Sequence, residues 1–233
     1  MDLLIDLQER GGRMPEGTGC RRKRKRRRYR AKLQCQEIYS GFGRSRGAAV
    51  GVIFVLQFEV ILEAKNRYCL SKTRAERAAL AYGEEAGTGP TAMDVVTVCP
   101  PLVLGPLLQP TVNTTTTRFV AYLTGENTEE KKRNTVDVRD VATALVLALE
   151  TPEAAGRRFF CSAHYMRVSE TVALVHSIHP DLKLLDYPRK FVRVEDEKEV
   201  SSKRLQALGW KFRTAAETLR DTIDSYKAAG ILK

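Results

Sequence analysis

The sequence predicts an α/β fold built on a mainly parallel sheet. From about residue 66 to the C-terminus, apolar β-branched runs alternate with helical patterns, which is the order expected of strand–helix–strand units. The run 93–99 (MDVVTVC) is almost continuously apolar, as expected for a parallel strand that is buried on both faces. A length of 233 residues and a hydrophobic fraction of 43% are ordinary for a globular protein.

The first 47 residues differ in character from the rest. They are rich in glycine and arginine, and residues 21–32 (RRKRKRRRYRAK) hold ten of the 39 basic residues. Such a run repels itself, so we predict a disordered basic segment over 1–47. The net charge of +11 comes from this segment, because the other 29 basic residues nearly balance 28 acidic ones. The charge therefore does not indicate a basic binding face on the fold.

The elements expected next follow from local patterns. Residues 48–62 are apolar and β-branched and predict one buried strand or two short ones. A helix is predicted over 71–86 and is ended by Gly87. Its signal is a set of residues at helical spacing: Ala75, Ala78, Ala79 and Tyr82. The strand 93–99 follows, and Pro100 and Pro101 end it because proline lacks the N–H that a strand needs.

Further elements are expected in the C-terminal half. They are a helix over 111–123, a polar loop over 125–133, a strand over 135–138, a helix over 141–150, a strand over 158–162, a helix over 169–178 and a last helix from 214 to 229. Asp140 and Ser169 stand where they could cap their helices. Residues 214–217 (TAAE) form a capping-box signature, and Gly230 is a helix stop.

Tyr68 and Lys72 are the candidate catalytic pair. Four residues apart at a helix start, their side chains lie on one face, one turn apart. A free tyrosine has a pKa of about 10, and an ammonium group one turn away lowers it. Such a tyrosine can exchange a proton with a carbonyl or alcohol oxygen while hydride moves at the neighbouring carbon. The lysine can also hold a ribose hydroxyl of a cofactor.

A long series of motifs extends this interpretation. In order they are NRYCLSKTRAE at 66–76, VVTVCPPLVLGPLLQPTVNTTTT at 95–117, TVDVRDVATALVLALE at 135–150, GRRFFC at 156–161 and the stretch 201–232, which begins SSKRLQALGWKF and ends AAGIL. The series closely resembles the plant cinnamoyl-CoA reductase and dihydroflavonol reductase group of the extended short-chain dehydrogenase/reductase (NAD-dependent epimerase/dehydratase) superfamily. The resemblance implies a Rossmann-like NADP-binding region over 48–150 and a smaller C-terminal substrate region over 151–233.

The resemblance also implies roles for particular residues. Tyr68 and Lys72 would be the proton-transfer pair and would contact the cofactor. The residues that would line the nicotinamide are Pro100, Pro101, Leu102 and Val103, with Thr115 nearby. The implied reaction is NADP(H)-dependent hydride transfer to a carbonyl or an acyl-CoA thioester. The implied substrate is a small phenylpropanoid-like molecule.

Two departures from the family pattern matter. True cinnamoyl-CoA reductases carry N-W-Y-C-Y-G-K where this chain has NRYCLSK at 66–72, which favours a reductase-like paralogue. The chain before Tyr68 is also too short for the family's N-terminal strands and its G-x-x-G-x-x-G turn. The nearest imitation, GFGRSRG at 41–47, has the wrong spacing. We therefore expect an incomplete Rossmann-like sheet, a chain that lacks the normal N-terminal half, and impaired NADP binding and activity.

Other readings remain open from the sequence. A non-catalytic pseudoenzyme or fragment would keep the fold without turnover. The run 21–32 could be a nuclear-localisation or nucleic-acid tail, but one aromatic residue, Tyr29, gives base stacking little support, so we do not expect nucleic acid as a partner. Neither do we expect a metal site, because the three histidines have no ligand partners at suitable spacing: His164, His176 and His179.

Cysteine usage and hydropathy indicate the compartment. The five cysteines show no CxxC and no regular spacing, and the N-terminus carries acidic residues in its short apolar stretch. Both features predict reduced thiols in the cytosol, without a secretory signal. The most apolar run, 48–62, is interrupted by Gln57 and Glu59 and is shorter than the about 20 residues that cross a bilayer. We therefore expect no membrane partner.

Overall fold

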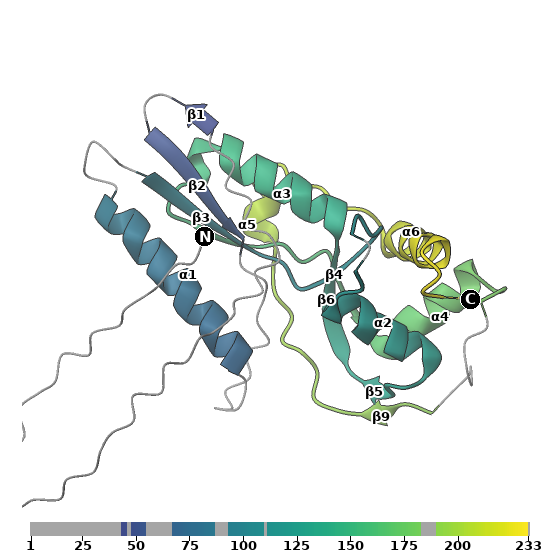
Figure 1. Ribbon diagram of the computed structural model, residues 1–233. Helices are drawn as coiled ribbons and strands as arrows, with labels where there is room; N and C mark the ends of the chain where they lie inside the picture. The colour runs from purple at the N-terminus through teal and green to yellow at the C-terminus, as the bar shows by residue number, and fades with distance from the viewer. Residues whose placement is uncertain are drawn as a thin grey trace, which may run out of the picture. The chain divides into compact units, whose positions relative to one another are not determined.

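The computed structural model describes residues 43–45, 48–54, 67–86, 93–109, 111–182 and 190–232. All of them belong to one of two units, Glu37–Lys233. The other unit, Met1–Gln36, and most of the segment predicted to be disordered lie outside the described residues. The domain boundaries expected after residues 47 and 150 stay predictions. Within the described ranges the predicted α/β fold is confirmed (Figure 1).

The first sheet holds the predicted parallel strands. Its members, in spatial order, are β1 (Gly43–Ser45), β2 (Ala48–Phe54), β3 (Met93–Cys99) and β7 (Arg158–Phe160). The strands β2, β3 and β7 run parallel, and β1 folds back antiparallel to β2. Strand β3 has the predicted bounds, and β2 is the first half of the predicted strand region 48–62. Residues 55–66 lie outside the described ranges.

Strand β3 is buried on both faces because a helix covers each side. Figure 1 shows α1 (Arg67–Ala86) and α3 (Val138–Glu150) on opposite sides of β2 and β3. Val96 and Val98 pack into a core with residues of α3. Residues 95, 97 and 99 alternate with them and contact α1. Burial on both faces, as predicted from the sequence, therefore explains why the run 93–99 is almost continuously apolar.

A second sheet has three strands among the described residues. In spatial order it contains β4 (Leu102–Leu104), β6 (Lys132–Asp137) and β8 (His164–Arg167). Strand β4 is parallel to β6, and β8 is antiparallel to β6. A third pair, β5 (Glu129–Glu130) and β9 (Val192–Arg193), runs parallel.

Three helices build a separate core beside β4. They are α2 (Thr114–Thr124), α4 (Val168–Ile178) and α6 (Ala215–Ala228). Their buried residues include Phe119, Val172 and Tyr226, and Leu104 joins them from β4. Short elements connect the rest: a 3-10 turn at Pro152–Ala154 and α5 at Lys203–Gln206. Among the described residues, no helix combines the length and apolar character needed to cross a membrane.

The predicted helix starts are partly wrong. The cap of α3 is Asp137, whose side chain accepts from the Arg139 N–H, and Asp140 lies inside the first turn. Arg167 stands at the cap position of α4, while the N–H and hydroxyl of Ser169 both donate to Glu130. Ser169 therefore binds Glu130 of the distant strand β5 and does not cap its own helix, contrary to the prediction from the sequence. The predicted capping box of α6 at Thr214 is confirmed.

The predicted polar loop over 125–133 is also wrong. This stretch contains β5 and the start of β6. Strand β8, at His164–Arg167, was also not predicted from the sequence. The two residues of β5 have no apolar alternation, and the strand exists because Glu129 pairs with Val192. Pairing with a distant segment leaves no local signal, which is the reason for the error.

Candidate active site

Helix α1 runs antiparallel to β3, and two contacts define this. Glu76 Oε1 accepts from Thr97 Oγ1 at 3.0 Å and from Cys99 Sγ at 3.3 Å, at the carboxyl end of the strand. Seven residues later Gly83 lies so close to Val95 that an added Cβ would be 2.8 Å from the Val95 Cβ. Seven helical residues rise about 10 Å, and four strand residues span about 13 Å. The two contacts therefore fit helix and strand lying side by side.

The predicted catalytic pair lies in the first two turns of α1. Tyr68 is the second residue of the helix, and Lys72 follows one turn later with a half-buried side chain. The side chain of Tyr68 lies outside the described part of the structure. Lys72 precedes Glu76 by one turn, about 6 Å along the axis, and Tyr68 precedes it by about 12 Å. Because Glu76 is level with the end of β3, these first turns extend past the carboxyl edge of the sheet.

The same edge carries Pro100 and Pro101. Both follow β3 directly and are buried. Leu102 and Val103 come next in β4, half-buried, and their side chains leave the strand on opposite faces. Val103 packs against the core under β3, whereas Leu102 packs against the core of α2, α4 and α6. Ligands of open α/β sheets bind at the carboxyl ends of the strands.

Thr115 lies in the first turn of α2. Asn113 caps this helix by accepting from the Thr116 N–H at 2.9 Å, and the Tyr226 hydroxyl donates to Thr116 Oγ1 at 3.2 Å. Thr115 is half-buried and lies in a helical turn that is stabilised by the Asn113 cap and by the hydrogen bond from Tyr226.

Glu76 is the residue at this site that sequence reasoning missed. Its side chain is 6% exposed, and besides Thr97 and Cys99 it binds Arg158 of β7, with Nε 2.6 Å from Oε1. Burial, reinforced by the Glu76 carboxylate, raises the pKa of the Cys99 thiol to about 12. A glutamate inside an Ala-rich helix is normally solvated, so nothing local distinguished it from Glu84 or Glu85.

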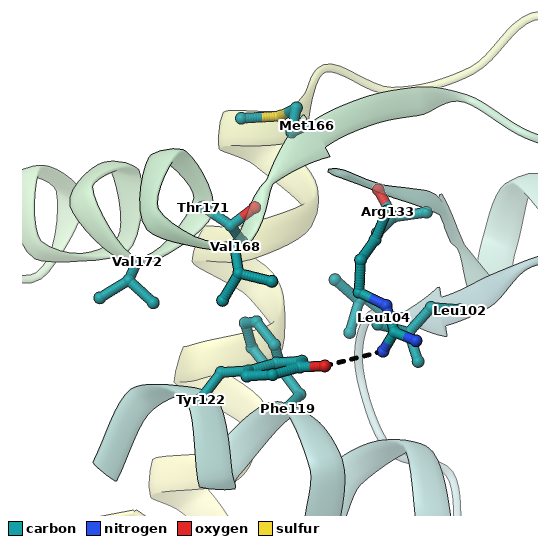
Figure 2. Close-up of a pocket in the computed structure, with 10 residues that line it drawn as sticks. Leu102, Leu104, Phe119, Tyr122, Arg133, Met166, Val168, Thr171 and Val172 are labelled. Carbon is teal, nitrogen blue, oxygen red and sulfur yellow. Dashed lines mark hydrogen bonds between the residues drawn. The ribbon is translucent and has the colours of Figure 1, made fainter. Parts of the chain in front are cut away.

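An apolar recess lies outside this edge, between α2, α4 and the second sheet (Figure 2). Its walls include Leu102, Phe119, Tyr122 and Val172, and Arg133 reaches it from β6. The Arg133 Nη1 donates to the Tyr122 hydroxyl at 2.9 Å, as the dashed line in Figure 2 marks. The inner volume of about 20 Å³ suits about one water molecule. The recess therefore belongs to the helical core, with Leu102 as its one link to the predicted site residues.

The residues at the sheet edge fit one end of a nicotinamide dinucleotide. A half-buried lysine at a helix start and two prolines that end a strand without N–H groups suit the nicotinamide and its ribose. The pyrophosphate end needs a glycine-rich turn between a strand and a helix. The described glycines with positive φ, at positions 105, 125, 156, 209 and 230, do not form such a turn. Within the described ranges, the fit is therefore to the nicotinamide end.

The histidines have structural surroundings. His164 Nε2 hydrogen-bonds the Arg213 main-chain oxygen at 2.9 Å, and His179 Nε2 lies 3.8 Å from Asp224 Oδ1. Where side chains are described, no group of three or more His, Cys, Asp or Glu could hold a metal ion.

A known protein family matches the part of the chain that includes this sheet edge. Residues 56–161 match the family described as NAD dependent epimerase/dehydratase family. The matched segment runs from before Tyr68 to just after β7, so it includes the predicted pair, β3 and the two prolines.

Three of the curated relatives are named as plant reductases. Cinnamoyl-CoA reductase 1 of Arabidopsis thaliana is 36% identical over 177 residues, which are 72% of this chain and 48% of that protein. Cinnamoyl-CoA reductase 1 of Petunia hybrida is 34% identical over 174 residues, 72% and 50% of the two chains. Dihydroflavonol 4-reductase of Zea mays is 34% identical over 68% of this chain and 43% of that protein. The chain spans about half the length of the curated relatives it matches.

Solved structures show the same fold. Vestitone reductase from alfalfa superposes with a TM-score of 0.61 at 26% identity, over 73% of this chain and 54% of that one. Yeast methylglyoxal/isovaleraldehyde reductase Gre2, complexed with NADPH, superposes with a TM-score of 0.55 at 29% identity, over 70% and 52%. By sequence and by fold, the chain belongs to the NAD dependent epimerase/dehydratase family, among relatives of the plant cinnamoyl-CoA and dihydroflavonol reductases.

Proposed function

We propose that this chain carries the proton-transfer pair and the nicotinamide side of a reductase. The reaction is hydride transfer between NADP(H) and a carbonyl or acyl-CoA thioester. One observation carries the proposal: the first turns of α1, with Tyr68 and Lys72, extend past the carboxyl end of β3, where Pro100 and Pro101 end the strand. Family membership supports the same roles for these residues.

The chemistry assigned to the pair follows from its spacing. An ammonium group one turn from a tyrosine favours the phenolate, so we propose that Lys72 helps the Tyr68 hydroxyl to release its proton. The Tyr68 hydroxyl then gives its proton to the oxygen of the substrate carbonyl as that oxygen becomes an alkoxide. Lys72 also holds a ribose hydroxyl of the cofactor. The bound dinucleotide supplies the hydride.

Cofactor affinity is expected to be low. The described residues supply the nicotinamide end of the site, and no glycine-rich cradle for the pyrophosphate occurs among them. Oriented backbone N–H groups at a helix start contribute much of dinucleotide binding in such folds. We therefore propose weak NADPH binding and slow turnover by this chain, compared with proteins that have the cradle.

The proposed substrate class is aromatic. The relatives are named for reduction of cinnamoyl-CoA and of a dihydroflavonol, and both are phenylpropanoid-derived. A small-molecule carbonyl or thioester of this class is the substrate that the relatives support. The departures from NWYCYGK in residues 66–72 favour a paralogue with its own preference within that class.

The experiment is an NADPH titration by fluorescence, followed by turnover with cinnamoyl-CoA and with a dihydroflavonol, on the purified full chain. Tyr68→Phe should lower kcat by roughly 100-fold or more, since a positioned acid typically contributes 10²–10⁴-fold. Tyr82→Phe is the matched control, because Tyr82 is 57% exposed on the same helix.

Three results separate the competing interpretations. Binding of NADPH together with turnover that depends on Tyr68 supports the proposal. Binding without turnover, or turnover unchanged in Tyr68→Phe, identifies a pseudoenzyme instead. Absence of NADPH binding at millimolar concentration overturns the proposed reductase function for this chain.

A further inference from the structure

Strand β4 covers only part of one side of β6. It pairs with residues 135–137, whereas β8 pairs on the other side of β6. The segment 194–202, which we call the strap, lies beside the first residues of β6 on the β4 side. The Lys132 N–H donates to Asp196 Oδ1 at 2.7 Å, and the Glu197 N–H donates to the Lys132 oxygen at 3.1 Å. In Figure 1 the strap is part of the trace that joins β9 to α5.

The side chain of Asn134 holds the middle of the strap. It is 1% exposed. Its Nδ2 donates to the Lys198 main-chain oxygen at 2.9 Å, and its Oδ1 accepts from the Val200 N–H at 3.2 Å. The amide group thus binds one acceptor and one donor of the strap's main chain, as a neighbouring strand would. Buried main-chain groups need such partners, so Asn134 fixes the path of the strap at these two residues.

A second anchor brings the end of the strap to the edge of the first sheet. The Ser202 hydroxyl donates to the Ser162 main-chain oxygen at 2.8 Å and accepts from the Ser162 N–H at 2.7 Å. Ser162 lies two residues beyond the end of β7, and its hydroxyl donates to Asn134 Oδ1 at 3.4 Å. The two anchors are therefore connected at the carboxyl end of β7.

The strap lies next to a residue that is predicted to line the nicotinamide. Leu102 pairs with Thr135, the residue that follows Asn134 in β6. Adjacent strands are about 4.8 Å apart and a strand residue rises about 3.3 Å, so the Asn134 and Leu102 main chains are about 6 Å apart. The strap and β4 therefore follow one another along the same side of β6. Between its anchored atoms the strap exposes the side chains of Lys198 and Glu199.

We propose that the strap forms a wall of the site at this edge, on the side that receives the substrate, and that Asn134 is a positioning residue that fixes residues 198–200 in this wall. Hydride transfer brings the reacting atoms to about 3–3.5 Å, so the substrate must lie against the nicotinamide and hence near the strap. The inference rests on the proposed function for the identity of its ligand, an aromatic carbonyl compound or thioester. Asn134 itself acts only through the strap.

Amide NMR spectra of the full chain test the wall without any turnover. A dihydroflavonol is added at millimolar concentration, with and without NADPH. The signals of residues 198–200 should shift, whereas those of residues 224–228, at the end of α6, should not. Unchanged signals at 198–200 under both conditions overturn the wall.

The variant Asn134→Ala tests the anchoring by amide exchange. The Val200 amide should exchange about tenfold faster than in the unaltered chain, because it loses its acceptor. The Glu197 amide should change by less than about twofold, since it donates to the main chain of β6. Asn127→Ala is the matched control, because the Asn127 side chain accepts from the Glu129 N–H within its own turn. Equal increases at both amides, or none at Val200, overturn the anchoring.

Kinetics connect the anchor to substrate binding. Asn134→Ala should raise KM for the carbonyl substrate about tenfold and change kcat by less than about threefold, because a wall contacts the ground state and the transition state alike. Ser201→Ala, at an exposed position beside the second anchor, should leave both constants unchanged. A lower kcat with KM unchanged overturns the positioning role.

A milder variant keeps the test decisive if Asn134→Ala does not fold. Asn134→Asp retains the acceptor for Val200 but, when ionised, loses the donor to Lys198, so KM should rise about threefold with kcat nearly unchanged. An unchanged KM in Asn134→Asp then overturns the role. If the unaltered chain shows no turnover, the proposed function fails while the NMR shifts still decide the wall. Turnover without shifts at 198–200 removes the wall and leaves the proposed function, so the two failures are distinguishable.

Discussion

The indole Nε1–H of Trp210 donates to the main-chain oxygen of Asp140, 2.9 Å away and 70 residues earlier in the chain. The Asp140 carboxylate in turn accepts from the Arg213 N–H at 2.8 Å and from the Arg213 guanidinium. The segment between α5 and α6 is thereby tied to the first turn of α3. Trp210 is buried in the core that also holds Val96 and Val98 of β3.

Replacing this tryptophan should weaken the attachment. Trp210→Phe removes the donor and leaves the Asp140 oxygen buried without it, which costs about 1–3 kcal/mol, and the smaller ring adds a packing loss. We expect the free energy of unfolding, measured by circular dichroism in urea, to fall by about 2–4 kcal/mol. Lys211→Ala, at an exposed neighbouring position, should be nearly neutral. Equal stability of the two variants would show that the indole contact contributes little.

Asp137 makes stability depend on pH in the acid range. Burial alone would raise the pKa of its carboxyl, but the hydrogen bonds from Arg139 outweigh burial and hold the pKa below the ordinary value of 3.8. A group with a depressed folded pKa stabilises the fold above its unfolded pKa, and this stabilisation is lost as pH falls through the folded pKa. We expect the unfolding free energy to decline as pH falls below about 4.

The variant Asp137→Asn should remove that dependence. It should be less stable than the unaltered chain at pH 7, and the difference should shrink as the pH is lowered below about 4. Urea unfolding across this range measures it. Asp221→Asn is the control, because Asp221 binds the same Arg139 at 2.7 Å but its side chain is 38% exposed. A difference that persists undiminished at low pH would contradict the assignment to the Asp137 carboxylate.

Gly105 is required where β4 ends. Its φ is 122°, and an added Cβ would lie 2.9 Å from Val138 Cγ1 and 3.2 Å from Asp137 Oδ1. Gly105→Ala should therefore cost backbone strain of about 1–3 kcal/mol in addition to the steric overlap. Gly209→Ala is the control for strain, because Gly209 also has a large positive φ, 100°, but nothing lies within 4 Å of an added Cβ. Thermal unfolding should show a clearly larger loss for Gly105→Ala; equal losses would exclude the close approach as a cause.

The buried cysteines should be chemically inert in the folded chain. Burial, together with Glu76, raises the pKa of Cys99 to about 12, and burial also raises the pKa of Cys161. At pH 8 about one Cys99 thiol in ten thousand would then be the reactive thiolate. After brief iodoacetamide treatment, peptide mass spectrometry should find both unlabelled, and both labelled in urea. Rapid native labelling of Cys99 would show that α1 does not cover it.

How far the sequence predicts the fold depends on whether a signal is local. The strand β3 was predicted with its bounds, because burial on both faces leaves a continuous apolar run. The capping box at Thr214 predicted the start of α6, because both partners lie within four residues. Tyr68 and Lys72 could be proposed as a pair for the same reason, because a spacing of four residues is visible in the local sequence alone.

The inward face of α1 was not predictable in this way. The apolar residues that indicated the helix include Ala75, Ala78 and Tyr82, and these are exposed. The residue that is buried instead is Glu76. A carboxylate inside a protein is stable only if donors meet it, and its donors come from β3 and from Arg158, 82 residues away. No window of sequence around Glu76 contains that information.

The sequence by itself thus determined the α/β class, the buried parallel strand, the capped last helix and the spacing of Tyr68 and Lys72. These features depend on neighbours within one or two turns or on the alternation of a single strand. Only the tertiary structure decided which face of α1 meets the sheet, that two acidic residues pair with β9, and that Asp137 and not Asp140 begins α3. Each of these depends on a contact with a residue that is distant in the sequence, and local propensity does not reflect such contacts.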